Sequence, residues 1–358
     1  MRRHFVRASA CLVALLTLSA CARRLQVKDI EPQEIETTLF LIGDAGEPDP
    51  RNNEFVLDSL KRQATEAPNR TVIVFLGDNV YPNGVPIDSS MTWADARRRL
   101  EAQVNAVPAG ARGIFLPGNH DWQQGGPYGL YSVRLQERMI AALAGGRDIR
   151  MLPGNGCPGP VAFEAGRLRF IALDTQWWLH DFIVRDEQSK CNTSVSGVTA
   201  TLRQLLQTTG DGRVSIVAGH HPLMTGGEHG GYCGLTGPFR RLGGYSQDIL
   251  SSLNRTMRDS LESAFKAKQP IMYAAGHDHN LQVMKGAPNA QYLIVSGAGS
   301  SDKAACAVYM RESYYVSQHR TGFMRVDILR GKGVLLSVFD YKGDGTPGRP
   351  FTRWLELR

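Results

Sequence analysis

The chain has 358 residues, of which 42% are hydrophobic and 21% charged, so it can form a globular protein of one large or two ordinary domains with a normal core. Its formal net charge of +7 is mild, and the sequence holds no dense run of lysine and arginine that would form a basic patch. This excludes a protein that binds nucleic acid mainly through basic charge, and no nucleic-acid partner is expected.

The start of the chain has the layout of a secretory signal and is not expected to join the folded core. Arg2, Arg3 and Arg7 form a positive start, residues 11–20 are mostly apolar, and Cys21 follows directly. The small residues before this cysteine resemble a bacterial lipoprotein box. They predict an exported lipoprotein of the cell envelope, attached to the membrane through lipid on Cys21. An ordinary cleaved signal or an uncleaved anchor helix is the alternative, although the apolar run is short for a membrane span.

The expected organisation of the chain follows from this signal. Residues 1–20 form the predicted signal peptide, and without them 38 basic and 34 acidic residues leave a formal charge of +4. Residues 21–37 are largely polar and are predicted to be a tether. One folded domain is expected over residues 38–358.

Two kinds of apolar pattern alternate along this predicted domain. Helical spacing predicts helices near 52–66, 93–104 and 198–206, and a continuous apolar run predicts a strand at 168–173. Two apolar runs near the end flank an Arg-Gly-Lys-Gly turn and predict a hairpin. These elements favour an α/β fold of two packed mixed sheets with helices outside. Long surface loops are predicted at residues 153–160, 176–193, 226–244 and 298–319.

Four cysteines remain once the one inside the signal and Cys21 are set aside, and an even number in an exported protein indicates disulfides. They are Cys157, Cys191, Cys233 and Cys306. Three pairings are possible and the sequence alone does not choose among them; our guess joins the first two and the last two. None has the close spacing of a zinc knuckle, so they are not counted as metal ligands.

Five short polar blocks each follow an apolar run that is predicted to be a strand. Each block places Asp, Asn, His or Tyr beside a glycine, which lets the chain turn sharply just past the strand. The blocks are residues 43–46, 77–81, 118–121, 219–222 and 276–279. A mostly parallel sheet brings such side chains together at its carboxyl edge, so the site is expected there. Oxygen ligands early and imidazoles late indicate two metal ions in one cleft.

The five blocks, in this order, resemble the calcineurin-like metallophosphoesterase superfamily. That superfamily is marked by an Asp block, a Gly-Asp block, Gly-Asn-His-Asp, a Gly-His block and Gly-His-x-His. Tyr81, three positions after Asp78, is similar to the tyrosine by which purple acid phosphatases bind ferric iron. The tripeptide 228–230, Glu-His-Gly, is similar to one in the small, tartrate-resistant members. The resemblance implies a four-layer αββα sandwich of two mixed sheets flanked by helices.

The resemblance also implies a set of metal ligands. The first ion would be bound by Asp44, Asp78, Tyr81 and His279. The second ion would be bound by Asp78, Asn119, His220 and His277. The Asp78 carboxylate would therefore bridge the two ions, which the resemblance implies are Fe(III) and a divalent ion, either Fe, Zn or Mn.

Two further histidines are implied to be catalytic. His120 would hold the phosphoryl oxygens or protonate the leaving group, and Asp121 is the candidate for orienting its ring. His229 is the second candidate acid. His221 is expected to support the site without binding a metal, and the family often has an aromatic residue at this place.

The function implied by these residues is hydrolysis of small phosphate monoesters by metal-bound hydroxide at the binuclear centre, as in an acid phosphatase. One alternative is a phosphodiesterase or nucleotide pyrophosphatase with divalent ions only. A second alternative is a non-catalytic surface protein that binds phosphate, metal or a host partner. Since no ligand of the pattern is missing, the sequence favours an enzyme over a protein whose active site has lost its activity.

Overall fold

A computed structural model of the chain describes residues 30–49, 54–87, 91–180, 191, 194–210, 212–233, 237–242, 245–286, 289–300, 304–331 and 333–357. The predicted signal peptide and Cys21 lie outside the described residues. Within the described part, no helix is long and apolar enough to cross a membrane. The first strand begins at Ile35, three residues before the expected start of the domain.

Two seven-stranded mixed sheets form the centre of the molecule. The first sheet has the strand order β14 (Phe351–Leu355), β13 (Val334–Tyr341), β12 (Thr321–Leu329), β1 (Ile35–Ile42), β2 (Thr71–Phe75), β3 (Arg112–Phe115) and β4 (Ile149–Met151). The second has the order β11 (Ser313–Ser317), β9 (Leu281–Lys285), β10 (Tyr292–Ser296), β8 (Met272–Ala275), β7 (Val214–Ala218), β6 (Leu168–Ala172) and β5 (Val161–Ala165).

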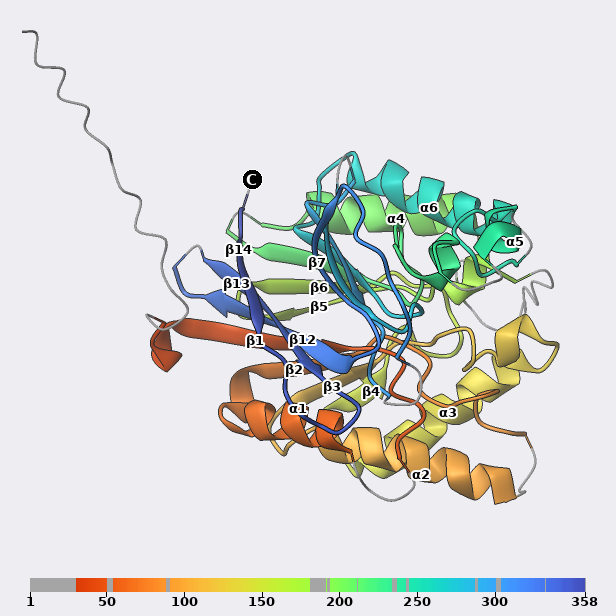
Figure 1. Cartoon of the computed structure of the whole chain (residues 1–358), viewed down its shortest axis with the longest axis horizontal. Helices are drawn as coiled ribbons and strands as arrows, with labels where there is room; N and C mark the ends of the chain where they lie inside the picture. The colour runs from red at the N-terminus through yellow and green to blue at the C-terminus, as the bar shows by residue number, and fades with distance from the viewer. Residues whose placement is uncertain are drawn as a thin grey trace, which may run out of the picture.

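Helices cover the outer face of each sheet, so the predicted four-layer αββα fold is confirmed (Figure 1). The helices α1 (Phe55–Thr65), α2 (Met91–Ala106) and α3 (Gly129–Ala144) lie against the first sheet. On the second sheet lie α4 (Val195–Gln207) and α6 (Ser252–Phe265), with the short α5 (Gly237–Arg241) nearby. The predicted helices correspond to α1, α2 and α4, whereas α3 and α6 were not predicted.

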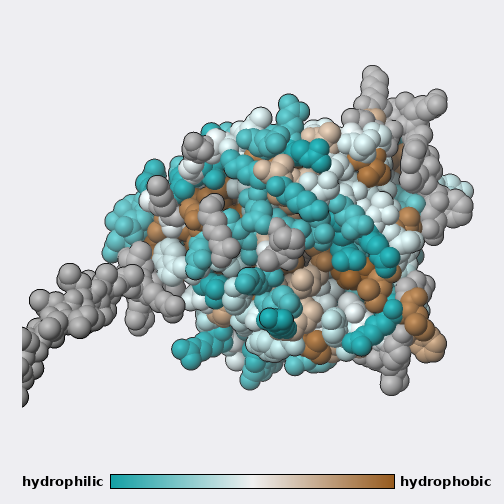
Figure 2. All heavy atoms as spheres, turned by 90° about the horizontal axis from the view of Figure 1, so that it is seen from above, coloured by the Kyte–Doolittle hydropathy of each residue, from teal (hydrophilic) through white to brown (hydrophobic). Residues whose placement is uncertain are grey.

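Alternating side chains along the strands fill three apolar layers. In β1, Leu39 and Leu41 point between the sheets, while Phe40 and Ile42 point toward α1 and α2. This period of two is the pattern of a strand that is buried on both faces. With its apolar side chains gathered in these layers, the molecule shows a mainly hydrophilic surface with small separate hydrophobic patches on the face in Figure 2.

Several local predictions can be compared with the observed elements. The predicted hairpin is β12 and β13, which pair antiparallel from Thr321 with Tyr341 to Ile328 with Val334. The loop predicted at 298–319 is wrong near its end, because β11 occupies 313–317. The loop predicted at 226–244 contains a turn of 3-10 helix at Glu228–Gly230 as well as α5.

The five motif-bearing strands divide between two sheets, which corrects the expectation of a single sheet edge. β1, β2 and β3 are parallel neighbours in the first sheet, and β7 and β8 are parallel neighbours in the second. Their carboxyl ends nevertheless meet, since the His277 N–H, just after β8, donates to Oδ2 of Asp44, just after β1, at 2.8 Å. The site is therefore built across the joint between the sheets.

Two disulfides join loops of the chain. Cys157 pairs with Cys191, and Cys233 pairs with Cys306. This is the pairing that was guessed from the sequence. The second disulfide ties the segment that follows His229 to the loop before β11, so both of these loops are fixed near the carboxyl ends of the strands.

Candidate metal centre

Three of the candidate ligands occupy a strained backbone conformation directly after their strands. Asp44, Asp78 and His277 have φ angles of 58°, 54° and 69°, in the left-handed region that non-glycine residues rarely adopt. Such strain persists only where the surrounding structure holds it, and it concentrates at functional sites. It turns each side chain sharply out of its strand toward the joint between the sheets.

The hydroxyl of Tyr81 is the meeting point of the first predicted ligand set. It donates to Oδ1 of Asp44 at 2.9 Å and to Oδ2 of Asp78 at 3.1 Å, and it lies 3.1 Å from Nε2 of His279. Nε2 of His279 is also 3.3 Å from Oδ1 of Asp44. Four side chains from three separate loops therefore point their donor atoms at one small volume.

The amide oxygen of Asn119 is the centre of the second predicted set. Its Oδ1 lies 2.9 Å from Nε2 of His220 and 3.1 Å from Nδ1 of His277. Nε2 of His220 is in turn 3.4 Å from Oδ2 of Asp78, the carboxylate that also contacts Tyr81. The two sets thus share Asp78, as the sequence predicted.

The donor set fits two metal ions. Three buried residues, Asp44, Asp78 and His220, offer ligand atoms within 4.8 Å of one another, and so do His220, His221 and His277. Carboxylate, phenol, amide and imidazole donors together suit iron or zinc, and one carboxylate shared by both sets is the usual means of holding two ions close together. The structure brings all seven predicted ligands together, while their binding of metal stays a prediction.

Charge pairing fixes the protonation of the shared carboxylate and its neighbour. Burial alone would raise the pKa of Asp78, but the positive charges of His220 and His120 and their hydrogen bonds lower it below its usual range. Burial opposes a charged His220, yet the Asp78 carboxylate raises its pKa to about 9. Binding of a metal at Nε2 of His220 must therefore displace a proton below about pH 9, which makes metal affinity rise with pH up to that value.

In the metal-free site, His277 and Tyr81 are both neutral near pH 7. Burial and the surrounding histidines lower the pKa of His277 well below its usual value, so its ring is free to bind a metal at neutral pH. Burial and the carboxylates of Asp44 and Asp78 raise the pKa of Tyr81 well above its usual value. A cation bound by the Tyr81 phenolate would therefore have to displace this proton.

Glycines stand directly behind the two carboxylates. A Cβ added to Gly118 would lie 2.2 Å from Oδ1 of Asp78, and one added to Gly276 would lie 2.5 Å from Oδ2 of Asp44. Both distances are far shorter than real contacts, so no other residue fits without moving a candidate ligand. This explains why the blocks pair their polar residues with glycine.

His120 lies beside the metal ligands, with one ring nitrogen held by the chain. Its Nδ1 donates to the carbonyl of Pro82, and its Nε2 is 3.9 Å from Oδ2 of Asp78. The side chain is 22% exposed, so it can reach a molecule in solution.

The structure does not support the predicted role of Asp121 in orienting that ring. The Asp121 carboxylate instead accepts from the backbone N–H groups of Gly118, Asn79 and Val80. A carboxylate whose oxygens are turned toward two loop backbones braces those loops. Asp121 therefore fixes the loops that carry Asp78 and Asn119.

His229 lies against the second ligand set. Its ring lies against the His277 ring, with centroids 3.7 Å apart and the ring planes tilted by 32°. Its Nδ1 is 2.8 Å from Oδ1 of the buried Asp248, and Arg240 donates to the same oxygen at 2.9 Å. Asp248 and Arg240 were not predicted, because they stand in a segment without any motif.

Two further residues form hydrogen bonds with the ring of His221, and neither was predicted from the sequence. Nδ1 of His221 is 2.9 Å from Oγ1 of Thr175, and Nε2 is 2.7 Å from Oε1 of Gln247. The carbonyl of Gln247 also lies 3.3 Å from Nε2 of His277. Protein groups therefore contact both ring nitrogens of His221, and its predicted role as a supporting residue that binds no metal stays a prediction. No local pattern would have identified Thr175 or Gln247.

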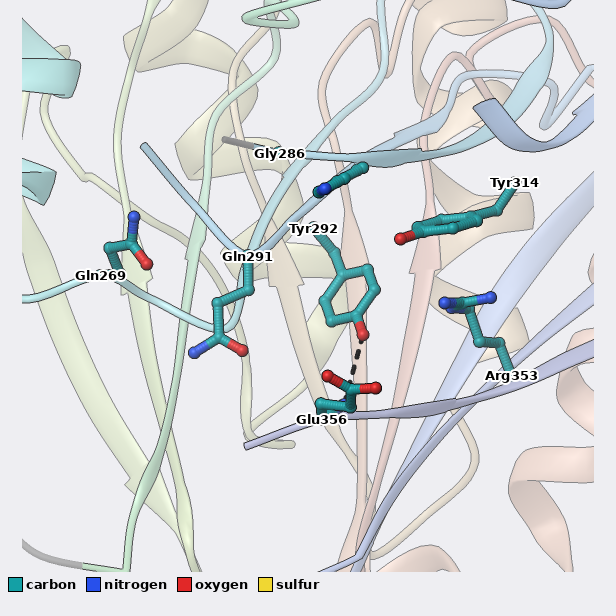
Figure 3. A pocket seen from close by; sticks show the side chains of 8 residues that line it. Gln269, Gly286, Gln291, Tyr292, Tyr314, Arg353 and Glu356 are labelled. Atoms are coloured by element: carbon teal, nitrogen blue, oxygen red, sulfur yellow. Dashed lines mark hydrogen bonds between the residues drawn. The ribbon is translucent and has the colours of Figure 1, made fainter. Parts of the chain in front are cut away.

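A pocket at the other end of the strands holds none of the candidate ligands (Figure 3). It has a volume of about 160 Å³ and is lined by Gln269, Lys285, Gly286, Gln291, Tyr292, Tyr314, Arg353 and Glu356. Tyr292 begins β10, whereas the opposite end of that strand contacts Gly43 beside the site. This pocket is therefore separate from the candidate metal centre.

The comparison with known families agrees with this geometry. The sequence profile of the calcineurin-like phosphoesterase family matches residues 37–281, a range that includes all seven predicted ligands. The chain belongs to the calcineurin-like phosphoesterase family. A comparison with curated protein sequences gives no significant match.

Solved structures with a similar fold include GAP50, the anchor in the inner membrane complex of Plasmodium. The similarity to it covers 90% of both chains at 17% sequence identity, with a TM-score of 0.59. A 5'-nucleotidase precursor from Thermus thermophilus matches at 12% identity over 89% of this chain and 54% of its own, with a TM-score of 0.37. At this identity the likeness to GAP50 concerns the fold alone.

Proposed function

We propose that this calcineurin-like phosphoesterase hydrolyses phosphate monoesters at a binuclear metal centre that resembles the centre of purple acid phosphatases. The observation that carries the proposal is the position of the Tyr81 hydroxyl, within 3.1 Å of donor atoms of Asp44, Asp78 and His279. The hydroxyl thus faces two buried carboxylates and the partly buried His279 ring, which are the other ligands of the proposed first ion.

The surroundings of Tyr81 support iron as one of the two ions. Burial and the two adjacent carboxylates raise the pKa of the phenol, so the metal-free Tyr81 carries a proton that a bound ion would have to displace. Fe(III) is acidic enough to displace the phenolic proton. Tyr81 would then bind it as a phenolate, with Asp44, Asp78 and His279 as the other ligands. The second ion would be a divalent Fe, Zn or Mn bound by Asp78, Asn119, His220 and His277.

When bound, the two ions would supply positive charge that attracts the phosphate group and would make a water molecule acidic enough to attack it near neutral pH. The chain provides the remaining groups. His120, fixed through Nδ1 on Pro82, presents Nε2 next to Asp78, where it can hold a phosphoryl oxygen or protonate the leaving group. His229 presents a second ring, packed against His277.

Export as a membrane-anchored lipoprotein belongs to the same proposal. Two disulfides in the described part of the chain support an oxidising compartment outside the cytoplasm. The lipid would be attached to Cys21, and the domain would face the periplasm or the cell surface. The substrate would then be a small phosphorylated molecule of that compartment.

A matched pair of esters tests the reaction. The metal-loaded protein should hydrolyse 4-nitrophenyl phosphate with a kcat/KM at least about tenfold above that for bis(4-nitrophenyl) phosphate, a difference of about 1.4 kcal/mol in the transition state. Both esters release the same phenol, so the comparison isolates monoester from diester. A preference for the diester would favour the divalent phosphodiesterase, and no turnover of either ester with any metal would favour a binding protein.

A further inference from the structure

The side chain of His229 is held by a buried acid that lies nineteen residues later in the chain. Oδ1 of Asp248 is 2.8 Å from Nδ1 of His229, and the Asp248 side chain is 1% exposed. Arg240 donates to the same oxygen at 2.9 Å. The guanidinium compensates the charge of the buried carboxylate, which would otherwise be costly to bury.

The geometry selects one tautomer of His229. An ionised carboxylate can only accept hydrogen bonds, so Nδ1 must carry the proton that bridges to Asp248. Nδ1 of His229 and Nη1 of Arg240 lie 3.3 Å apart because both donate to Oδ1 of Asp248. With a proton on Nδ1, neither nitrogen can accept a hydrogen bond from the other. Nε2 has no hydrogen-bond partner among the described residues and is the nitrogen left for a substrate.

The segment around Asp248 is itself attached to the metal centre. Gln247 contacts His221 through its side chain and His277 through its carbonyl. The N–H of Ile249 donates to the carbonyl of His229 at 3.0 Å. Three successive residues therefore meet three histidines of the site, so the position of Asp248 relative to the predicted ligands is fixed.

We infer that Asp248 is a positioning residue that keeps Nε2 of His229 directed to the leaving group of the substrate. The inference rests on the proposed phosphatase function and adds to it a group outside every motif of the sequence. Protonated His229 gives the proton on Nε2 to the leaving oxygen as the bond from phosphorus to that oxygen breaks. The electron pair of the broken bond stays on the leaving oxygen, which takes up that proton. Water forms the new bond to phosphorus and loses a proton to solvent. The ring ends neutral with its proton on Nδ1, facing Asp248, and solvent protonates Nε2 again.

A double-mutant cycle with two leaving groups tests this role. In the metal-loaded protein, Asp248→Asn should lower kcat for phenyl phosphate by about 10- to 100-fold, because phenol leaves poorly without a proton. The loss for 4-nitrophenyl phosphate should be clearly smaller, and the metal content should not change. In a His229→Ala background, Asp248→Asn should cause no further loss with either ester. Asp259→Asn, an exposed acid on α6, is the matched control and should leave both rates unchanged.

A second measurement does not depend on turnover. Nitrogen NMR of the histidine rings in the metal-free protein should show the neutral His229 ring with its proton on Nδ1, and a mixture of tautomers in Asp248→Asn. Independent, multiplicative losses in the cycle, or a proton on Nε2 in place of Nδ1, would overturn the role of Asp248 alone. A wild-type protein that hydrolyses neither ester would overturn the proposed function and this inference together.

Discussion

Asp78→Ala should remove both metals and lower kcat/KM for a phosphate monoester by at least roughly 10³-fold, since the two ions supply several kcal/mol of transition-state stabilisation. Asp78 is the only predicted ligand that belongs to both sets, touching Tyr81 on one side and His220 on the other. Losing one shared carboxylate also leaves two cations to repel each other without a bridge. Metal analysis by mass spectrometry, together with the rate on 4-nitrophenyl phosphate, checks both effects.

The folding of this variant can be controlled separately. Asp58→Ala makes the same chemical change at an exposed position on α1 and should keep both metals and full activity. Thermal unfolding in the presence of a chelator should show that Asp78→Ala still folds but with a lower Tm, because the variant loses the buried carboxylate that pairs with His220. A fully metallated and active Asp78→Ala protein would contradict the shared carboxylate.

His120→Asn should keep both metals and lower kcat by about 10²- to 10⁴-fold, the usual contribution of a catalytic acid or base. The asparagine amide can still donate to the carbonyl of Pro82, as Nδ1 of the ring does, so the local backbone is preserved. What is lost is Nε2, the nitrogen that lies 3.9 Å from the shared carboxylate. Steady-state kinetics and metal content on the same preparation separate catalysis from binding.

A histidine outside the candidate ligands and catalytic residues provides the comparison. His319 is exposed and has a φ of 55°, a conformation that asparagine tolerates, so His319→Asn should be as active as the wild type. An unchanged kcat in His120→Asn would remove this residue from the mechanism. Loss of metal in that variant would instead make His120 a supporting group of the metal centre.

The local parts of the fold could be predicted from the sequence because they depend on short-range patterns. The apolar runs before each glycine block became β1, β2, β3, β7 and β8, since a strand buried on both faces must be apolar throughout. The glycine beside each polar residue signalled the sharp turn that brings Asp44 and Asp78 to the edge. The resemblance then supplied the order in which these blocks bind metal.

The remaining parts depend on contacts that no local pattern records. Division of the five strands between two sheets follows from pairings such as β1 with β12, whose residues are nearly 300 positions apart in the chain, as Thr38 and Asp327 are. The partners of the site histidines, Thr175, Gln247 and Asp248, come from loops with ordinary compositions. The assignment of Asp121 was wrong for the same reason, because sequence adjacency to His120 does not give the direction of a side chain.

The most direct test of the proposed binuclear centre is metal analysis with a visible absorption spectrum of the purified, oxidised protein and of Tyr81→Phe. We expect about two metals per chain, one of them iron, and a purple charge-transfer band that disappears in Tyr81→Phe while the protein stays folded. Two metals without any colour would contradict Tyr81 as an iron ligand. A protein that binds no metal, and regains none on reconstitution, would contradict the binuclear centre itself.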